Sequence, residues 1–105
     1  MSEHAVVLST AGSEDEASRI ASALVEGRLA ACVNVVPGVL STYRWKGSVH
    51  TDREWLLVIK TRRDAFERVR DAIRAAHSYE QPEVVLIPID AGDPGYLAWI
   101  DASVD

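Results

Sequence analysis

Hydrophobic and polar positions along the first quarter of the chain predict one strand followed by one helix. Residues 4–10 form a short apolar run that is typical of a buried strand. Ser13 stands three positions before Glu16, the spacing of a capping box, in which each side chain satisfies a free N–H group at the start of a helix. Gly27 is the expected C-cap of this helix. The apolar stripe that predicts the helix consists of Ala17, Ile20, Ala21 and Leu24.

Alternating positions over residues 30–61 predict two long strands joined by a tight turn. The Pro37-Gly38 step predicts a bend or bulge in the first strand, because proline donates no hydrogen bond to a strand ladder and glycine tolerates unusual backbone angles. Lys46 and Gly47 predict the turn, since glycine accepts the positive φ of a two-residue hairpin. Both strands of this hairpin exceed the usual length of about five or six residues.

The remainder of the chain predicts a second helix, a short strand and a final helix. Acidic side chains are expected to cap the second helix, and the stretch EVVLIPI at 83–89 predicts a fourth strand at an edge of the sheet. An aspartate followed by proline is typical of a helix start. These signals are Asp64, Glu67 and His77 for the bounds of the second helix, Pro88 for the strand, and Asp93 with Pro94 for the final helix.

The predicted order of elements is β-α-β-β-α-β followed by a C-terminal helix. This order is the split βαβ arrangement, an α+β fold of the ferredoxin-like type, with one mostly antiparallel sheet and two helices on a single face. We expect one domain over residues 1–105, because this length is ordinary for a single hydrophobic core.

Charge and cysteine content narrow the functional classes. The net charge of −5 argues against a nucleic-acid or anionic-membrane surface, since both bind through clustered positive charge. Cys32 is the only cysteine, so no disulfide forms within the chain, and no apolar run approaches the roughly 20 residues of a membrane span. The beginning MSEHAVVLST lacks the pattern of a signal peptide. These features predict a soluble cytoplasmic protein.

The long hairpin predicts an interface with another chain. Two helices cover only a small sheet, so a longer hairpin exposes unpaired backbone groups and the rings of Tyr43, Trp45 and Trp55. Exposed strand edges are commonly covered by symmetric assembly. The alternative is that these rings fold back onto their own domain.

Four separated motifs resemble those of the CutA divalent-cation-tolerance family. They are RLAACVNVVPGVLSTYRWKG at 28–47, IKT at 59–61, HSYEQPE at 77–83 and YLAWI at 96–100. The resemblance covers nearly the whole chain and implies a ferredoxin-like homotrimer in which the hairpin and the C-terminal region pair with neighbouring subunits, an architecture similar to the PII signalling proteins. It also implies heavy-metal tolerance and copper binding, but no defined reaction.

Cys32 and His77 are the candidate metal ligands. A thiolate suits soft ions such as Cu(I), and imidazole is a common ligand for copper and zinc. The alternatives are that Cys32 is a small buried hydrophobe and that His77 sits at a helix C-terminus for electrostatic reasons.

The family's metal motifs are incomplete in this chain. Some relatives carry a cysteine where Ser9 stands, a second histidine at Ala76 and a proline at Ser78. A site made from one cysteine and one histidine is expected to be weak unless several subunits contribute. His4 and His50 are isolated in the sequence and are expected at the surface.

The resemblance further implies a ligand cleft between subunits. The alternatives are a structural ion pair between Glu54 and Lys60, a loop anchor at Tyr79 and core packing of Trp99. Charged groups beside aromatic rings are typical of a small-ligand pocket. The matching positions are Glu54, Lys60, Tyr79, Glu80, Tyr96 and Trp99.

The sequence therefore predicts a trimeric protein of the CutA type that responds to divalent metal ions, with copper as the first ion to test. No nucleophile elbow, P-loop, dinucleotide fingerprint or HExxH motif is present, so we expect no enzymatic activity. The alternatives are a PII-like module that binds a small anionic ligand through Lys60, without a dedicated metal, and a scaffold whose assembly is its function.

Overall fold

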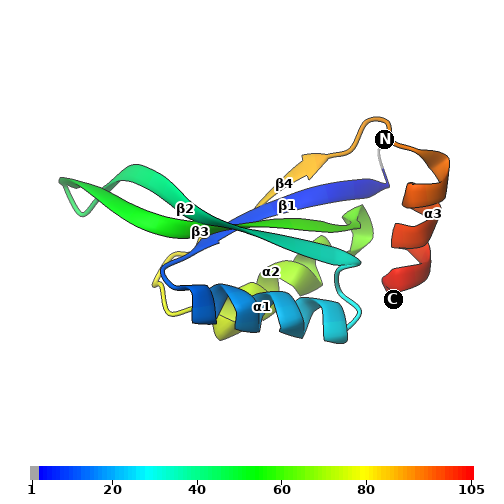
Figure 1. The fold of residues 1–105 in the computed structure, drawn as a ribbon, viewed down its shortest axis with the longest axis horizontal. Coiled ribbons are helices and arrows are strands. Elements are labelled where there is room, and N and C mark those ends of the chain that lie inside the picture. The colour runs from blue at the N-terminus through cyan, green and yellow to red at the C-terminus, as the bar shows by residue number, and fades with distance from the viewer. Residues whose placement is uncertain (1–2) are drawn as a thin grey trace.

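Within residues 3–105, four antiparallel strands form one sheet in the order β2-β3-β1-β4, accompanied by three α-helices. The computed structural model describes residues 3–105, and Figure 1 shows their arrangement. The predicted ferredoxin-like α+β fold is confirmed. The single domain over 1–105 stays a prediction, and its first two residues lie outside the described range. The elements are β1 (His4–Ala11), α1 (Glu14–Glu26), β2 (Cys32–Trp45), β3 (Ser48–Arg62), a 3-10 turn (Arg63–Ala65), α2 (Phe66–Ala76), β4 (Val85–Pro88) and α3 (Pro94–Ser103).

Both α1 and α2 cover the same face of the sheet, while α3 lies at the end of the sheet opposite the hairpin turn (Figure 1). Apolar side chains alternate along β1 and β3, so that every second residue points into the layer between sheet and helices. Among residues 3–105 no helix combines the length and the apolar character that a bilayer crossing requires. The largest fully buried apolar side chains are Val7, Ile20, Leu24, Leu57, Ile59, Val69, Ile73 and Ile100.

The start of α1 shows half of the predicted capping box. The Ser13 hydroxyl accepts a hydrogen bond from the Glu16 N–H at 3.1 Å. The Glu16 side chain is buried and lies instead beside His77 and Ser78, so the reciprocal bond of the box is not made. Gly27 is the C-cap as predicted, at φ −79°.

The predicted side-chain cap of α2 is wrong. A 3-10 turn leads into the helix, and Ala65 occupies the N-cap without a side-chain hydrogen bond. Asp64 instead accepts two hydrogen bonds from Arg62, at 3.0 Å from Nε and 2.8 Å from Nη2. This guanidinium holds the pKa of Asp64 below its usual range.

The hairpin of β2 and β3 follows the sequence prediction closely. A bulge lies between Val36 and Val39, and Gly38 within it has a φ of 74°. Lys46 and Gly47 form the turn with φ values of 50° and 83°, the left-handed pair of a type I′ hairpin. The hairpin extends beyond the helices (Figure 1), which gives the molecule a long axis of 44 Å.

The last two elements also lie where they were predicted. Strand β4 is shorter than the run at 83–89 and, among the described strands, pairs with β1 alone, which makes it an edge strand ending at Pro88. Helix α3 begins at Pro94, and the Asp93 carboxylate accepts a hydrogen bond from the Tyr96 N–H at 3.0 Å.

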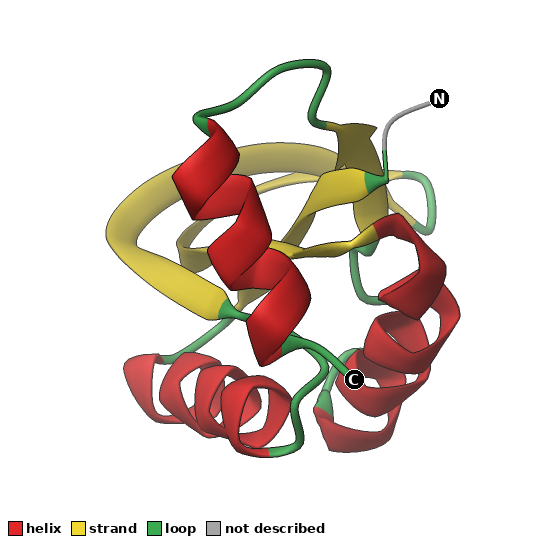
Figure 2. Cartoon of the chain, turned by 90° about the vertical axis from the view of Figure 1, so that its right-hand side faces the viewer, coloured by secondary structure: helices red, strands yellow, loops and turns green. Residues whose placement is uncertain are grey.

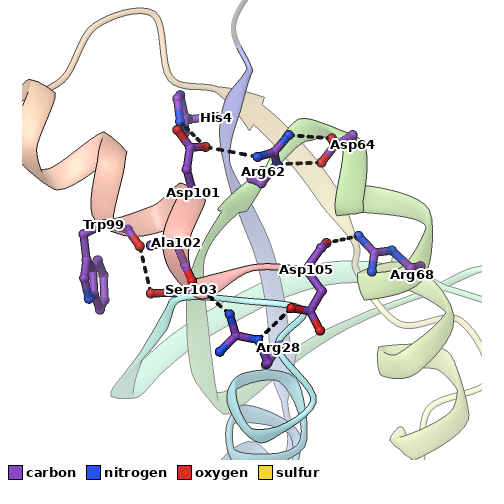
Figure 3. Close-up of polar contacts among 10 residues, drawn as sticks. All are labelled: His4, Arg28, Arg62, Asp64, Arg68, Trp99, Asp101, Ala102, Ser103 and Asp105. Carbon is purple, nitrogen blue, oxygen red and sulfur yellow. Dashed lines mark hydrogen bonds and ion pairs between the residues drawn. The ribbon is translucent and has the colours of Figure 1, made fainter.

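Charged side chains fasten α3 to the rest of the fold (Figure 3). Asp101 lies 2.9 Å from His4 Nε2 and 3.4 Å from Arg62 Nη1, and Arg28 donates to the Asp105 carboxylate at 2.7 Å. Figure 2 views the molecule from this side, so that α3 lies in front of the sheet, with the C-terminal end of α3 close to α1. The prediction that His4 is an isolated surface residue is wrong, because its side chain is mostly buried and faces Asp101.

Candidate functional site

A cleft of about 720 Å³ lies between the hairpin and the loop that follows α2. Strand β2 contributes hydroxyl groups and rings, β3 contributes one buried carboxylate, and the loop contributes acidic, amide and aromatic side chains. The lining residues are Thr10, Ser41, Thr42, Tyr43, Trp45, Glu54, Tyr79, Glu80, Gln81, Pro82 and Glu83. The volume is in the range of small-molecule sites.

Glu54 and Tyr79 form the central contact of the cleft. Glu54 is only 6% exposed, and its Oε2 accepts a hydrogen bond of 2.6 Å from the Tyr79 hydroxyl. Burial and the neighbouring carboxylate both raise the pKa of Tyr79, because each disfavours the phenolate. A Cβ at Gly12 would lie 2.9 Å from the Tyr79 hydroxyl oxygen, so glycine leaves room for this ring. Tyr79 is thus a neutral donor facing a buried acceptor.

His77 anchors the loop that carries Tyr79. Its side chain is fully buried, and Nε2 donates to the Thr10 carbonyl at 2.6 Å while Nδ1 accepts from the Tyr79 N–H at 3.1 Å. Glu16 Oε1 lies 3.2 Å from the same Nδ1 and accepts from the Ser78 hydroxyl at 3.1 Å. Because both ring nitrogens have partners, a metal ion bound to His77 would replace one of these contacts.

The hairpin forms the outer rim of the cleft. Tyr43 donates a hydrogen bond to Asp52, and this bond raises the pKa of the Tyr43 phenol. Lys46 Nζ lies 3.6 Å from Glu80 Oε2 and 5.6 Å from the centre of the Trp45 ring. Both rim rings keep about two fifths of their surface exposed, at 41% for Tyr43 and 39% for Trp45.

The predicted ligand residues lie in three separate places. Glu54, Tyr79 and Glu80 line the cleft. Lys60 does not: it lies six positions further along β3 and contacts the Asn34 side-chain oxygen, so the alternative of a Glu54–Lys60 ion pair is wrong for this chain. Separate from both are Tyr96 and Trp99, which form a ring pair on α3 with centroids 5.4 Å apart.

The surroundings of the other predicted aromatic residues differ along the chain. Trp99 is 45% exposed, so it is not packed in the core of the single chain. Trp55 is half-buried against the core, whereas Tyr43 and Trp45 lie exposed near the tip of the hairpin. His50 is exposed as predicted, and its ring stacks on Tyr43 at 5.6 Å.

One chain does not bring Cys32 and His77 together. Cys32 pairs with Lys60 across the hairpin, whereas His77 contacts Thr10, whose partner on β3 is Leu56. Four positions along a strand correspond to roughly 13 Å. Among residues 3–105 no group of three His, Cys, Asp or Glu side chains is placed to hold a metal ion. The Cys32 side chain is half-buried, with Sγ 3.9 Å from the Asn34 oxygen.

Sequence reasoning missed two supporting groups of the cleft. Glu16 was assigned to a cap, although its carboxylate faces His77, and Asp52 was not singled out, although it binds Tyr43. The turn at 46–47 could have predicted the contact of Asp52 with Tyr43. It fixes the strand register, which places Asp52 opposite Ser41 and therefore two residues from Tyr43. No local pattern predicts the contact of Glu16 with His77.

Comparisons with known proteins agree on one family. A family model described as "CutA1 divalent ion tolerance protein" matches residues 5–103. The "Divalent-cation tolerance protein CutA" of Thermus thermophilus is 52% identical over 95 residues, which cover 90% of this chain and 92% of that protein. "Protein CutA, chloroplastic" of Arabidopsis thaliana is 42% identical over 98 residues, which cover 93% of this chain but only 54% of that longer protein.

A solved structure extends this similarity to the fold. The "Periplasmic divalent cation tolerance protein CutA" of Archaeoglobus fulgidus is 42% identical, with a TM-score of 0.94. The superposition covers 97% of this chain and 99% of that one. Sequence and fold therefore match over nearly the same residues.

Proposed function

This chain belongs to the CutA1 divalent ion tolerance family, and on that ground we propose that it takes part in the tolerance of divalent cations. The observation that carries the proposal is the family match over residues 5–103. The names of the family and of its relatives denote tolerance of cations rather than a reaction, so the proposed role is binding and not catalysis. The proposed location is the cytoplasm. Two relatives are named differently, one as a chloroplastic protein and one as a periplasmic protein.

Copper is the first ion we propose to test, with Cys32 and His77 as its ligands. The half-buried thiol of Cys32 is a suitable soft donor. His77 has to release Thr10 or Tyr79 to bind a metal ion, and the two ligands lie far apart in one chain. Binding is therefore expected to be weak, or to draw ligands from more than one subunit.

A copper titration of the metal-free protein tests this assignment. We expect the double variant Cys32→Ser, His77→Ala to bind less copper than the wild type. Cys32→Ser alone is the cleaner variant, because His77→Ala also loosens the loop at the cleft. Equal copper binding by the wild type and the double variant would contradict the two proposed ligands.

We propose that the functional form is a homotrimer. Val6 and Leu8 alternate with buried residues of β1 and therefore point away from the two helices. Their partners on β4 are Ile87 and Val85, which are 48% and 46% exposed. This apolar sheet face and the projecting hairpin are surfaces that further copies of the chain would bury.

A pair of matched charge substitutions tests the trimer. Ile87→Glu places a carboxylate on the open sheet face, whereas Val25→Glu places one on α1 at a site that is similarly exposed. Sedimentation equilibrium should show a trimer for the wild type and for Val25→Glu, and smaller species for Ile87→Glu. Equal masses for the two variants would contradict the proposed use of this face.

A second candidate function is small-ligand binding, and the cleft favours it. Its volume and its mixture of rings, hydroxyl groups and carboxylates are typical of a ligand site. The cleft lining does not support the prediction of an anionic ligand bound through Lys60, because Lys60 lies outside the cleft. Mass analysis of small molecules released from the purified protein tests this function, and their release should decrease in a cleft variant such as Tyr79→Ala.

A further inference from the structure

The cleft is unusual in the balance of its charged side chains. Its lining includes three carboxylates, those of Glu54, Glu80 and Glu83, and no Lys, Arg or His within the described residues 3–105. Its aromatic rings are those of Tyr43, Trp45 and Tyr79. Carboxylates and the faces of aromatic rings both attract positive charge. The chain thus offers negative potential around a space large enough for a small molecule.

Glu54 is the carboxylate with the strongest need for a partner. It is 94% removed from solvent, and the one hydrogen bond that its side chain makes within the described part of the chain comes from the neutral Tyr79 hydroxyl. No Lys, Arg or His among the described residues forms an ion pair with it. A buried carboxylate without a cation is costly, and a charge-assisted hydrogen bond offsets that cost. A cation that enters the cleft would supply this missing interaction.

Lys46 illustrates the chemistry that the rim accepts. Its ammonium group lies 3.6 Å from Glu80 and 5.6 Å from the centre of the Trp45 ring, a combination of ion pair and cation–π contact. The Lys46 side chain is 73% exposed, so it is held loosely and is able to leave. The rim therefore already contains one ammonium group, supplied by the chain itself.

A bare metal ion fits the cleft less well than an organic cation. No three His, Cys, Asp or Glu side chains of residues 3–105 converge on one point, as a metal ion requires. The carboxylates are instead separated by rings, over a volume of about 720 Å³. An organic cation with an apolar body would contact the rings and a carboxylate together.

We propose that the cleft binds a small organic cation, with an ammonium or guanidinium group donating to Glu54 and an apolar body against Tyr43 and Trp45. The proposal rests on the small-ligand function given above and specifies its ligand class. Tyr79 is a positioning residue in this account, because its hydroxyl fixes one oxygen of Glu54 and leaves the other for the ligand. Lys46 competes with the ligand at the rim.

Three probes of nearly equal size test the charge preference. Benzylammonium, benzyl alcohol and benzoate share a ring but carry positive, zero and negative charge. Each is titrated into the metal-free full-length protein, with ligand-observed NMR and calorimetry as readouts. We expect benzylammonium to bind about tenfold or more tightly than the other two. Lys46→Met should strengthen its binding severalfold by removing the competing ammonium.

A matched pair of variants tests the role of Glu54. Glu54→Gln removes the charge and keeps an acceptor for Tyr79, whereas Glu67→Gln makes the same charge change at an exposed position of α2. Binding of benzylammonium should fall about tenfold in the first variant and stay unchanged in the second. Thermal melting confirms that both variants are folded. Equal binding by both variants would overturn the proposal.

The remaining outcomes distinguish a wrong ligand class from a failure of small-ligand binding itself. If benzoate or benzyl alcohol binds as tightly as benzylammonium, the ligand class is wrong and small-ligand binding stands. If no probe binds at millimolar concentration, the proposal is overturned, and the mass analysis of released molecules decides separately on small-ligand binding. If copper(II) binding depends on Glu54 while benzylammonium binding does not, the cleft is a metal site and the proposal is overturned.

Discussion

The polar and aromatic side chains at the two ends of the sheet differ in the partners that they have within the chain. At the end covered by α3, charged groups are paired within the chain: Asp101 faces His4 and Arg62, and Arg28 binds Asp105 (Figure 3). At the hairpin end, aromatic rings are exposed, and no Lys, Arg or His of residues 3–105 forms an ion pair with the buried carboxylate of Glu54. At the first end these charged groups have partners within a single chain, while Tyr96 and Trp99 of α3 keep 43% and 45% of their surface exposed. The second end is where further copies or ligands would add contacts.

The largest expected contrast is one of folding stability. Ile59→Ala removes a fully buried side chain of β3 and should lower the free energy of unfolding by about 2–5 kcal/mol. Val49→Ala changes a residue of the same strand that is 60% exposed on the hairpin, and should change it by about 0.5 kcal/mol or less. Chemical denaturation at one protein concentration measures both. Similar losses of unfolding free energy in the two variants would contradict the view that the hairpin contributes less to folding stability than the core.

Two tryptophans sharpen the comparison along one hairpin. Trp45→Ala should weaken assembly about tenfold, because it removes an exposed ring near the tip, while leaving the fold intact. Trp55→Ala should lower folding stability instead, because that ring packs against the core. Analytical ultracentrifugation at falling concentration and thermal melting separate the two effects. Dissociation of Trp55→Ala without loss of folding stability would show that Trp55 belongs to the interface.

A smaller effect is expected at Ser9. Its hydroxyl oxygen is the buried side-chain polar atom that lacks a hydrogen-bond partner among residues 3–105. Ser9→Ala removes this atom and should raise the free energy of unfolding by about 1 kcal/mol, since an unpaired buried polar group is costly. Thr61→Ala is the control, because the Thr61 hydroxyl donates to the Leu29 carbonyl at 2.6 Å and its loss should destabilise the fold. A destabilised Ser9→Ala would indicate that the hydroxyl has a partner in solution.

The smallest effect concerns Asp64 and Arg62. The pKa of Asp64 is lowered in the fold, so its contribution is present above the usual value of 3.8 and is lost as the pH falls through the lowered value. Asp64 is 63% exposed, which limits this contribution to about 0.5 kcal/mol. Denaturation of the wild type and Asp64→Asn should differ at about pH 7, and the difference should shrink as the pH falls through the lowered pKa of Asp64. A difference that persists in acid would contradict the ion-pair explanation.

Local patterns predicted the elements well because the relevant signals lie close together in the chain. The bulge at Gly38, the turn at Lys46-Gly47 and the start of α3 at Asp93 each depend on neighbouring residues, and each is confirmed. The capping predictions for Glu16 and Asp64 depended on side chains that found other partners after folding. A local signal names what a side chain is able to do, and the tertiary structure decides which partner it has.

The candidate site was predicted only in part for the same reason. Resemblance to a family named Glu54, Tyr79 and Glu80, and these residues do line one cleft. It also named Lys60 and Trp99, which the single chain places elsewhere. The contact between His4 and Asp101 spans 97 positions, and no periodicity of the sequence predicts it. Lys60 and Trp99 lie outside the cleft of one chain, so only assembly with further copies would bring them close to it.

Native mass spectrometry of the metal-free protein, followed by limiting copper, tests most directly the claim that the hairpin end is completed by other copies of the chain. We predict a mass three times that of the chain for the wild type, and a shift toward monomer for Trp45→Ala at equal concentration. Copper bound to the trimer would support the proposed metal role as well. A wild-type protein that remains monomeric at micromolar concentration would contradict the account.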